Sequence, residues 1–321
     1  MTIHIALLGL RQAGASLALA LKQHGSVQVT GHDSQPDPAG RNALGRLAPS
    51  PAQAVANADL VVLALPLDEQ REMLRGIGPK VRAGGVIVSL TPLLQPPLEW
   101  AADLPAERYF VAAHPTLNPD LLPASPAEPR PDLFTRGLWA LAPAKGCAPE
   151  AVQLASDLAA LLGATSYFID PGEHDGLMGG AEALPVLFSW ALMQSAVNSA
   201  GWRDFRKMAD ARFARATALL DEAERLPVLL DRPQALNALD RALTELQSLR
   251  AKLAAAEAGE LDRALEAMAV RRAKWLAEKR RADWQEQEPM PANVPTVGAM
   301  LGHMFAGNLF AKKAGDEKKS E

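Results

Sequence analysis

Short apolar runs alternate with helical or loop stretches along the first half of the chain. The run at residues 3–8 is followed by Gly9 and Gly14 and by the helical stretch Ala15–Gln23, a pattern that predicts a strand, a tight turn and a helix. Further apolar runs predict strands at residues 27–31, 60–65, 86–90, 109–113, 138–141 and 164–169. Because strands that alternate with helices form parallel sheets, we expect a doubly wound α/β domain over residues 1–170.

From Glu173 onward the pattern becomes helical. Leucines recur at three- and four-residue spacing between Leu236 and Leu253, and the spacing is repeated between Leu261 and Met268. Such stripes need a partner surface, and helices this long bury them more easily in a dimer than alone. Residues 171–288 are therefore predicted to form an all-helical substrate and dimerisation domain of a homodimer. A self-contained helical bundle is the alternative.

Residues 289–321 differ in character from the helices before them. Three prolines at positions 289, 291 and 295 break the helix, and the apolar stretch Val297–Phe310 is followed by a charged tail. We expect a docking segment that covers the partner subunit. A helix on a membrane surface is the alternative, although its polar face is weak.

Composition excludes several classes of partner. A net charge of -4 argues against nucleic acid. The sequence has no run of about 18 apolar residues and no basic-then-apolar start, so we expect a cytoplasmic protein that neither spans a membrane nor carries a secretory signal. Cys147 is the single cysteine, which excludes an internal disulfide and a multi-cysteine metal site, and no metal is predicted.

The first strand and helix carry a degraded dinucleotide-binding pattern. Gly9 and Gly14 stand at the first and third glycine positions of a phosphate-binding turn, while Arg11 occupies the second. The Arg11 guanidinium could clamp a phosphate or fill the space of the pyrophosphate. Asp33, nineteen residues past Gly14, lies near the place of the ribose-binding acid of a Rossmann unit and favours NAD over NADP. Its alternative role is to cap the loop.

Five segments share their layout and order with a known family: Ile5–Leu10, Ala58–Pro66, Ala113–Pro115, Glu173–Met178 and Glu182–Pro185. Together they resemble the prephenate/arogenate dehydrogenase family, over roughly residues 3–280. The resemblance implies a Rossmann-type domain followed by a helical dimerisation domain. It also implies an NAD-dependent oxidoreductase that decarboxylates prephenate or arogenate oxidatively in tyrosine biosynthesis.

The resemblance also implies roles for individual residues. His114, in the His-Pro pair, would polarise or deprotonate the substrate hydroxyl while hydride leaves the same carbon, for which a neutral imidazole is suited. Arg203, Arg206 and Lys207 lie in a segment that resembles the family's motif for a small-molecule carboxylate substrate. The alternative for His114 is a buried or capping histidine. The alternative for the three cations is a solvated helix face. His174 is expected to help start a helix rather than to take part in catalysis.

Four positions depart from the family pattern: Arg11, Pro92, Val186 and Lys207. Lys207 stands where arginine is usual, which keeps the charge but loses the bidentate fork. These departures leave two other functions open. The chain could be a dehydrogenase-like binding module with a degenerate active site, or a dehydrogenase for another small carboxylate-bearing alcohol.

Overall fold

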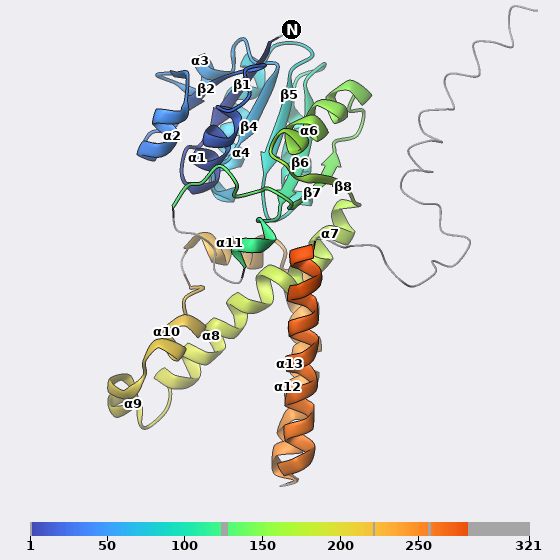
Figure 1. Ribbon diagram of the computed structural model, residues 1–321. Coiled ribbons are helices and arrows are strands. Elements are labelled where there is room, and N and C mark those ends of the chain that lie inside the picture. The colour runs from blue at the N-terminus through green and yellow to red at the C-terminus, as the bar shows by residue number, and fades with distance from the viewer. Residues whose placement is uncertain (1, 123–127, 221, 256–257, 282–321) are drawn as a thin grey trace, which may run out of the picture. The chain divides into compact units, whose positions relative to one another are not determined.

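A computed structural model describes residues 2–122, 128–220, 222–255 and 258–281 and contains one eight-stranded sheet in the order β3-β2-β1-β4-β5-β6-β7-β8 (Figure 1). The strands are β1 (Ile3–Leu8), β2 (Val27–His32), β3 (Arg46–Leu47), β4 (Leu60–Leu63), β5 (Val86–Leu90), β6 (Tyr109–Pro115), β7 (Leu138–Pro143) and β8 (Thr165–Phe168). The first six strands have the order of a Rossmann sheet, which confirms the predicted fold class.

One pairing departs from the predicted parallel sheet. β7 runs antiparallel to β6 and pairs Ala140 with His114 and Trp139 with Pro115. A parallel pairing needs a long crossover connection, usually a helix. The described part of the connection between β6 and β7 holds only η3 (Pro119–Leu121), so the chain turns back beside β6 instead of crossing over.

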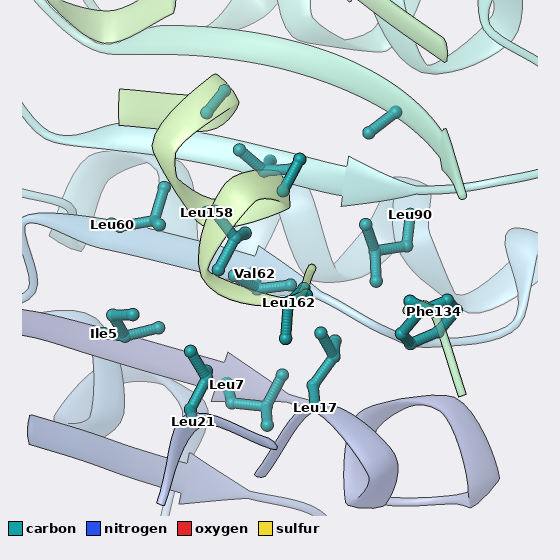
Figure 2. Close-up of a cluster of buried hydrophobic side chains, with 14 of the residues drawn as sticks. Ile5, Leu7, Leu17, Leu21, Leu60, Val62, Leu90, Phe134, Leu158 and Leu162 are labelled. Carbon is teal, nitrogen blue, oxygen red and sulfur yellow. The ribbon is translucent and has the colours of Figure 1, made fainter. Parts of the chain in front are cut away.

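Helices cover both faces of the sheet. Because successive side chains of a strand point to opposite faces, each central strand contributes to two cores. Ile5 and Leu7 belong to the core on the face covered by α1 (Gln12–Leu21) and α6 (Pro149–Leu161), as Figure 2 shows. Alternate residues of the same strands form the second core beneath α3 (Pro51–Val55), α4 (Leu67–Ile77) and the end of α5 (Gln95–Trp100). The remaining short helices are α2 (Pro38–Ala43), η1 (Gly78–Lys80) and η2 (Ala101–Asp103).

The chain after β8 is helical, as predicted. The helices are α7 (Pro171–Met178), the π-helical η4 (Gly179–Ala183), α8 (Leu184–Val197), α9 (Trp202–Met208), α10 (Ala211–Ala216), α11 (Glu222–Leu230), α12 (Arg232–Ala254) and α13 (Ala258–Arg281). The first of them begins at Pro171 because the Asp170 side chain accepts hydrogen bonds from the backbone N–H groups of Gly172 and Glu173. Residues 282–288 and the predicted docking segment 289–321 lie outside the described residues.

The predicted leucine stripes are largely exposed in a single copy of the chain. On α12, the exposed side chains include those of Leu236, Leu243, Leu246, Leu249 and Leu253. On α13 they include Leu265, Met268 and Trp275. Only the start of α12 is buried, through Ala235 and Ala238, where it packs against η4. The apolar faces of these two helices therefore have little cover from the described part of the same chain.

The stretch Pro171–Val197, made of α7, η4 and α8, is long and apolar enough to cross a membrane by length and composition alone. Its 18-residue window has a mean hydropathy of 1.3, and 22% of it is buried. This stretch limits the prediction that the chain has no segment apolar and long enough to span a membrane. A single stretch of this kind is weak evidence for a membrane span, and this one carries the buried polar pair His174 and Asp175.

Candidate active site

His114 lies at the carboxyl end of β6, where ligands of open α/β sheets collect. It shares a face of its strand with Phe110 and Ala112, which belong to the core beneath α4 and α5. The alternation of side chains along β6 therefore directs the imidazole toward α5 and α7 rather than toward α1 and α6.

Two histidines and an aspartate form a hydrogen-bonded chain at this edge. His114 Nδ1 lies 2.9 Å from Nε2 of His174, and the two rings meet edge to face. His174 Nδ1 lies 2.8 Å from Oδ1 of Asp175. His174 and Asp175 are only 3% and 1% exposed, whereas His114 is partly buried. The far end of this chain is thus closed to solvent and the His114 end is the more accessible one.

Asp175 also holds the start of α5. Its Oδ1 accepts a hydrogen bond from the Leu94 backbone N–H at 2.7 Å, and its Oδ2 accepts one from the Gln95 N–H at 2.9 Å. The residue before α5 supplies no side-chain cap, so a carboxylate 80 residues away along the chain satisfies these donors. The predicted role of His174 at the start of α7 is wrong, because Asp170 caps that helix and His174 faces the site.

With an ionised Asp175 and two neutral imidazoles, the hydrogen-bond pattern assigns a proton to one nitrogen of each ring. An ionised carboxylate only accepts, so His174 must donate from Nδ1 to Asp175. A neutral His174 then has a lone pair at Nε2, which accepts the Nδ1 proton of His114. A neutral His114 with its proton on Nδ1 carries its lone pair on Nε2. The arrangement therefore prepares Nε2 of His114 to accept a proton.

The surroundings keep His114 neutral. Burial, followed by the neighbouring His174, lowers the pKa of His114 to about 3 from its ordinary 6.5, and Lys279 acts in the same direction while Asp175 opposes it. The folded protein thus binds fewer protons here than the unfolded chain. The resulting stabilisation is present above about pH 6.5 and is lost as the pH falls toward 3.

A second set of candidate residues lies at the carboxyl ends of β1, β2 and β4. Gly9 has a φ of +93°, and a Cβ there would lie 2.4 Å from the backbone oxygen of Ala64. A Cβ on Gly14 would lie 1.9 Å from the backbone oxygen of Gly9, so α1 packs directly against the turn. These are the close approaches that the first and third glycines of a dinucleotide turn permit.

Asp33 and Arg11 line a pocket of about 130 Å³ at this turn, together with Gly9, Ala64 and Leu65. Asp33 Oδ2 accepts a hydrogen bond from the Leu10 N–H at 2.6 Å, and Oδ1 accepts one from the Gln35 N–H at 2.7 Å. These two bonds leave lone pairs on the carboxylate for a ribose hydroxyl. Arg11 is exposed at the start of α1, which has no side-chain cap, so the helix end can receive a phosphate.

A larger groove of about 630 Å³ lies elsewhere, at the amino ends of β1 and β2 beside His4 and Val27. Ligands of open α/β sheets bind at the opposite edge, where the strands end. We therefore assign the site to the carboxyl edge. Among the described residues, no group of three His, Cys, Asp or Glu side chains is arranged to hold a metal ion.

The predicted carboxylate anchors do not join His114 within one copy of the chain. Arg203, Arg206 and Lys207 are exposed on α9, and Lys207 forms a 2.8 Å ion pair with the exposed Asp204. α8 alone has 14 residues and is about 20 Å long, and Figure 1 shows α9 at the end of α8 farther from the sheet. Within a single copy, the solvated-face alternative fits these three cations.

The sequence reasoning also missed a buried pair that ties β4 to β5. Ser89 donates its hydroxyl proton to the Gln70 side-chain oxygen, and the Gln70 amide donates to the carbonyls of Leu65 at 2.9 Å and Leu90 at 2.7 Å. Leu65 also lines the pocket at the glycine turn. This network therefore fixes the strand ends between the two candidate sites. A glutamine in the apolar face of α4 was the available signal.

Comparison with known proteins agrees with this geometry. Residues 17–168 match the family model of the prephenate dehydrogenase nucleotide-binding domain. The fold resembles arogenate dehydrogenase from Synechocystis, with a TM-score of 0.67 and 20% identity over 85% of this chain and 100% of that one. It also resembles Aquifex aeolicus prephenate dehydrogenase in complex with hydroxyphenyl propionate and NAD+, with a TM-score of 0.68 and 17% identity over 85% of this chain and 98% of that one. A search of curated protein sequences gave no match.

The role of Asp175 predicts a loss of stability when its charge is removed. Asp175→Asn places an amide N–H₂ among buried donors, so we expect the free energy of unfolding to fall by about 1–3 kcal/mol. Glu173→Gln, the same change at an exposed position of α7, should alter it by less than about 0.5 kcal/mol. Urea denaturation measures both values. Equal effects of the two substitutions would contradict the assigned role.

Proposed function

We propose that the chain is a member of the prephenate/arogenate dehydrogenase family, whose nucleotide-binding domain model matches residues 17–168, and that it is an NAD-dependent oxidoreductase that decarboxylates prephenate or arogenate oxidatively. The observation that carries the proposal is the chain from His114 through His174 to Asp175, at the same edge of the sheet as the glycine turn. A nucleotide-binding turn beside a prepared base fits the removal of a hydride and a proton from an alcohol.

In this proposal His114 is the general base. Its Nε2 takes the proton of the substrate hydroxyl, while His174 accepts the hydrogen bond from its Nδ1 and the Asp175 carboxylate stabilises the imidazolium that forms. Bound NAD supplies the hydride acceptor. Loss of the ring carboxylate as carbon dioxide makes the ring aromatic, which renders the reaction effectively irreversible. In the family that the sequence resembles, this reaction belongs to tyrosine biosynthesis.

Gly9, Gly14, Arg11 and Asp33 are the residues proposed to hold the dinucleotide. Gly9 permits the tight turn and Gly14 lets α1 pack against it, while the start of α1, which has no side-chain cap, and the Arg11 guanidinium supply positive charge. Asp33 would bind the adenosine ribose through its remaining lone pairs.

We expect NAD to bind more tightly than NADP, because the Asp33 carboxylate would repel a 2′-phosphate. Isothermal titration calorimetry with both dinucleotides measures the difference, and Asp33→Asn should reduce it. Equal or tighter binding of NADP by the unaltered protein would contradict the assignment of Asp33 and would indicate that Arg11 or Arg41 binds the phosphate.

Replacing His114 by Asn should lower kcat on prephenate or arogenate by roughly a hundredfold to ten-thousandfold, because a positioned general base usually contributes that much to the rate. The affinity for NAD should change little. His4→Asn is the matched control, since His4 is exposed at the opposite edge of the sheet. Steady-state kinetics and NAD titration measure both effects. Full activity of His114→Asn would remove the mechanism.

Two other functions lead to different results with the unaltered protein. The predicted carboxylate anchors on α9 are exposed and lie away from His114, which motivates two alternative functions. Absence of NAD binding would favour a binding module with a degenerate active site. NAD binding without turnover of prephenate or arogenate would favour a dehydrogenase for another small carboxylate-bearing alcohol.

We also propose that the chain forms a homodimer through its helical part. The apolar faces of α8, α12 and α13 are exposed in a single copy, and Trp190 and Trp275 are 57% and 50% exposed. Exposed faces of this size mark an association surface. Light scattering should report about twice the 34.2 kDa chain mass. A monomer at micromolar concentration that is insensitive to dilution would contradict the proposal.

A further inference from the structure

The last turn of α13 is anchored beside the loop that follows His114. α13 packs against η3, which begins four residues after Pro115 in the chain. Arg280 donates a hydrogen bond to the Leu122 carbonyl at 3.4 Å, and its own carbonyl accepts one from the Arg136 guanidinium. Arg136 in turn forms a 2.7 Å ion pair with Asp120 of η3. The carboxyl end of α13 is therefore held at the same edge of the sheet as the candidate active site.

Lys279 immediately precedes this anchor and differs from the other basic residues of the turn. Arg280 and Arg281 are exposed, whereas Lys279 is partly buried, and burial lowers its pKa. Its charge acts on His114, whose pKa it lowers. The packing of α13 on η3 brings the turn that carries Lys279 toward the strand end at His114, and burial leaves its ammonium group in surroundings with less water than an exposed helix end.

We propose that Lys279 binds the carboxylate of the substrate beside His114 and so selects carboxylate-bearing alcohols. This inference rests on the proposed function. A partly desolvated ammonium gains most from an anionic ligand, because a charge-assisted hydrogen bond strengthens where water is scarce. Within one copy of the chain, α9 lies at the far end of α8, while the end of α13 that carries Lys279 packs on η3, at the same edge of the sheet as His114.

An alternative, structural role for Lys279 is to complement the helix dipole at the carboxyl end of α13. Arg280 and Arg281 occupy the same turn and serve that purpose in solvent. A residue that only complements the dipole has no need of the burial that lowers the pKa of Lys279. The two roles differ in what they require of a ligand, since only an anchor discriminates a carboxylate from a neutral analogue.

The test compares Lys279→Met with Lys274→Met, a matched change at an exposed position of the same helix. Calorimetry on the NAD-loaded protein measures the affinity for 3-(4-hydroxyphenyl)propionate and for the neutral 4-ethylphenol. We expect Lys279→Met to weaken binding of the carboxylate about ten- to a hundredfold, with 4-ethylphenol unaffected. Lys274→Met should change neither affinity, and Lys279→Arg should restore part of the carboxylate affinity.

A second readout is the acidic limb of the pH profile of kcat/KM. The titratable groups that act on His114 are His174 and Asp175 from α7 and Lys279 from α13. Because Lys279 lowers the pKa of His114, Lys279→Met should move this limb to higher pH, and an ammonium group too far from His114 to share a ligand with it would leave the limb in place.

The outcomes separate this inference from the proposed function. If the unaltered protein binds the carboxylate and Lys279→Met binds it equally well, Lys279 is not the anchor and the proposed function is untouched. Equal weakening by Lys274→Met, or equal loss of 4-ethylphenol binding, also overturns the inference. If the unaltered protein neither binds the carboxylate nor oxidises prephenate or arogenate, the proposed function and the inference both fail.

Discussion

The buried carboxylate of Asp175 is the interaction on which the site depends. It accepts hydrogen bonds from the backbone N–H groups of Leu94 and Gln95 and from Nδ1 of His174. Hydrogen bonds to a charged group contribute about 1.5–3 kcal/mol each, and a buried carboxylate without them would be strongly unfavourable. The same group therefore joins the first turn of the helical part to the start of α5 and sets the proton positions of two histidines.

The sheet provides the second constraint. Because side chains alternate along β6, His114 projects to the face where α5 and α7 meet, and its position at the strand end leaves it partly open. β1, β4, β5 and β6 are neighbours in the sheet, so the glycine turn after β1 and the His114 site lie along one edge. The Gln70 and Ser89 pair fixes the strand ends between them. Ligands of open α/β sheets bind at this edge, so the topology gives the proposed dinucleotide and substrate sites adjacent places.

Local sequence patterns predicted most of the sheet, since strands buried on both faces are read as short apolar runs. The direction of β7 was not predictable in this way, because a run of apolar residues carries no information about the neighbouring strand's orientation. His114 was found through the His-Pro pair after its strand. His174 was misassigned because an acidic residue near a helix start usually caps that helix, whereas the partners of Asp175 lie 80 residues away.

The cations show the same limit. Arg203, Arg206 and Lys207 match a family motif, but a motif does not state where α8 carries them. Lys279 carries no sequence signal, because its relation to His114 arises from the packing of α13 on η3. Contacts between segments far apart in the chain thus decide which charged groups meet at the site. The hydrophobic period of the sequence does not encode these contacts.

The central claim is that Asp175, through His174, leaves Nε2 of a neutral His114 without a proton. Nitrogen-15 NMR of histidine-labelled protein reads the protonation and tautomer of each ring directly. The account predicts that His114 at pH 7 carries its proton on Nδ1, and that it stays neutral well below its ordinary pKa of 6.5. A proton on Nε2 at neutral pH, or a titration midpoint for His114 near 6.5, would contradict it.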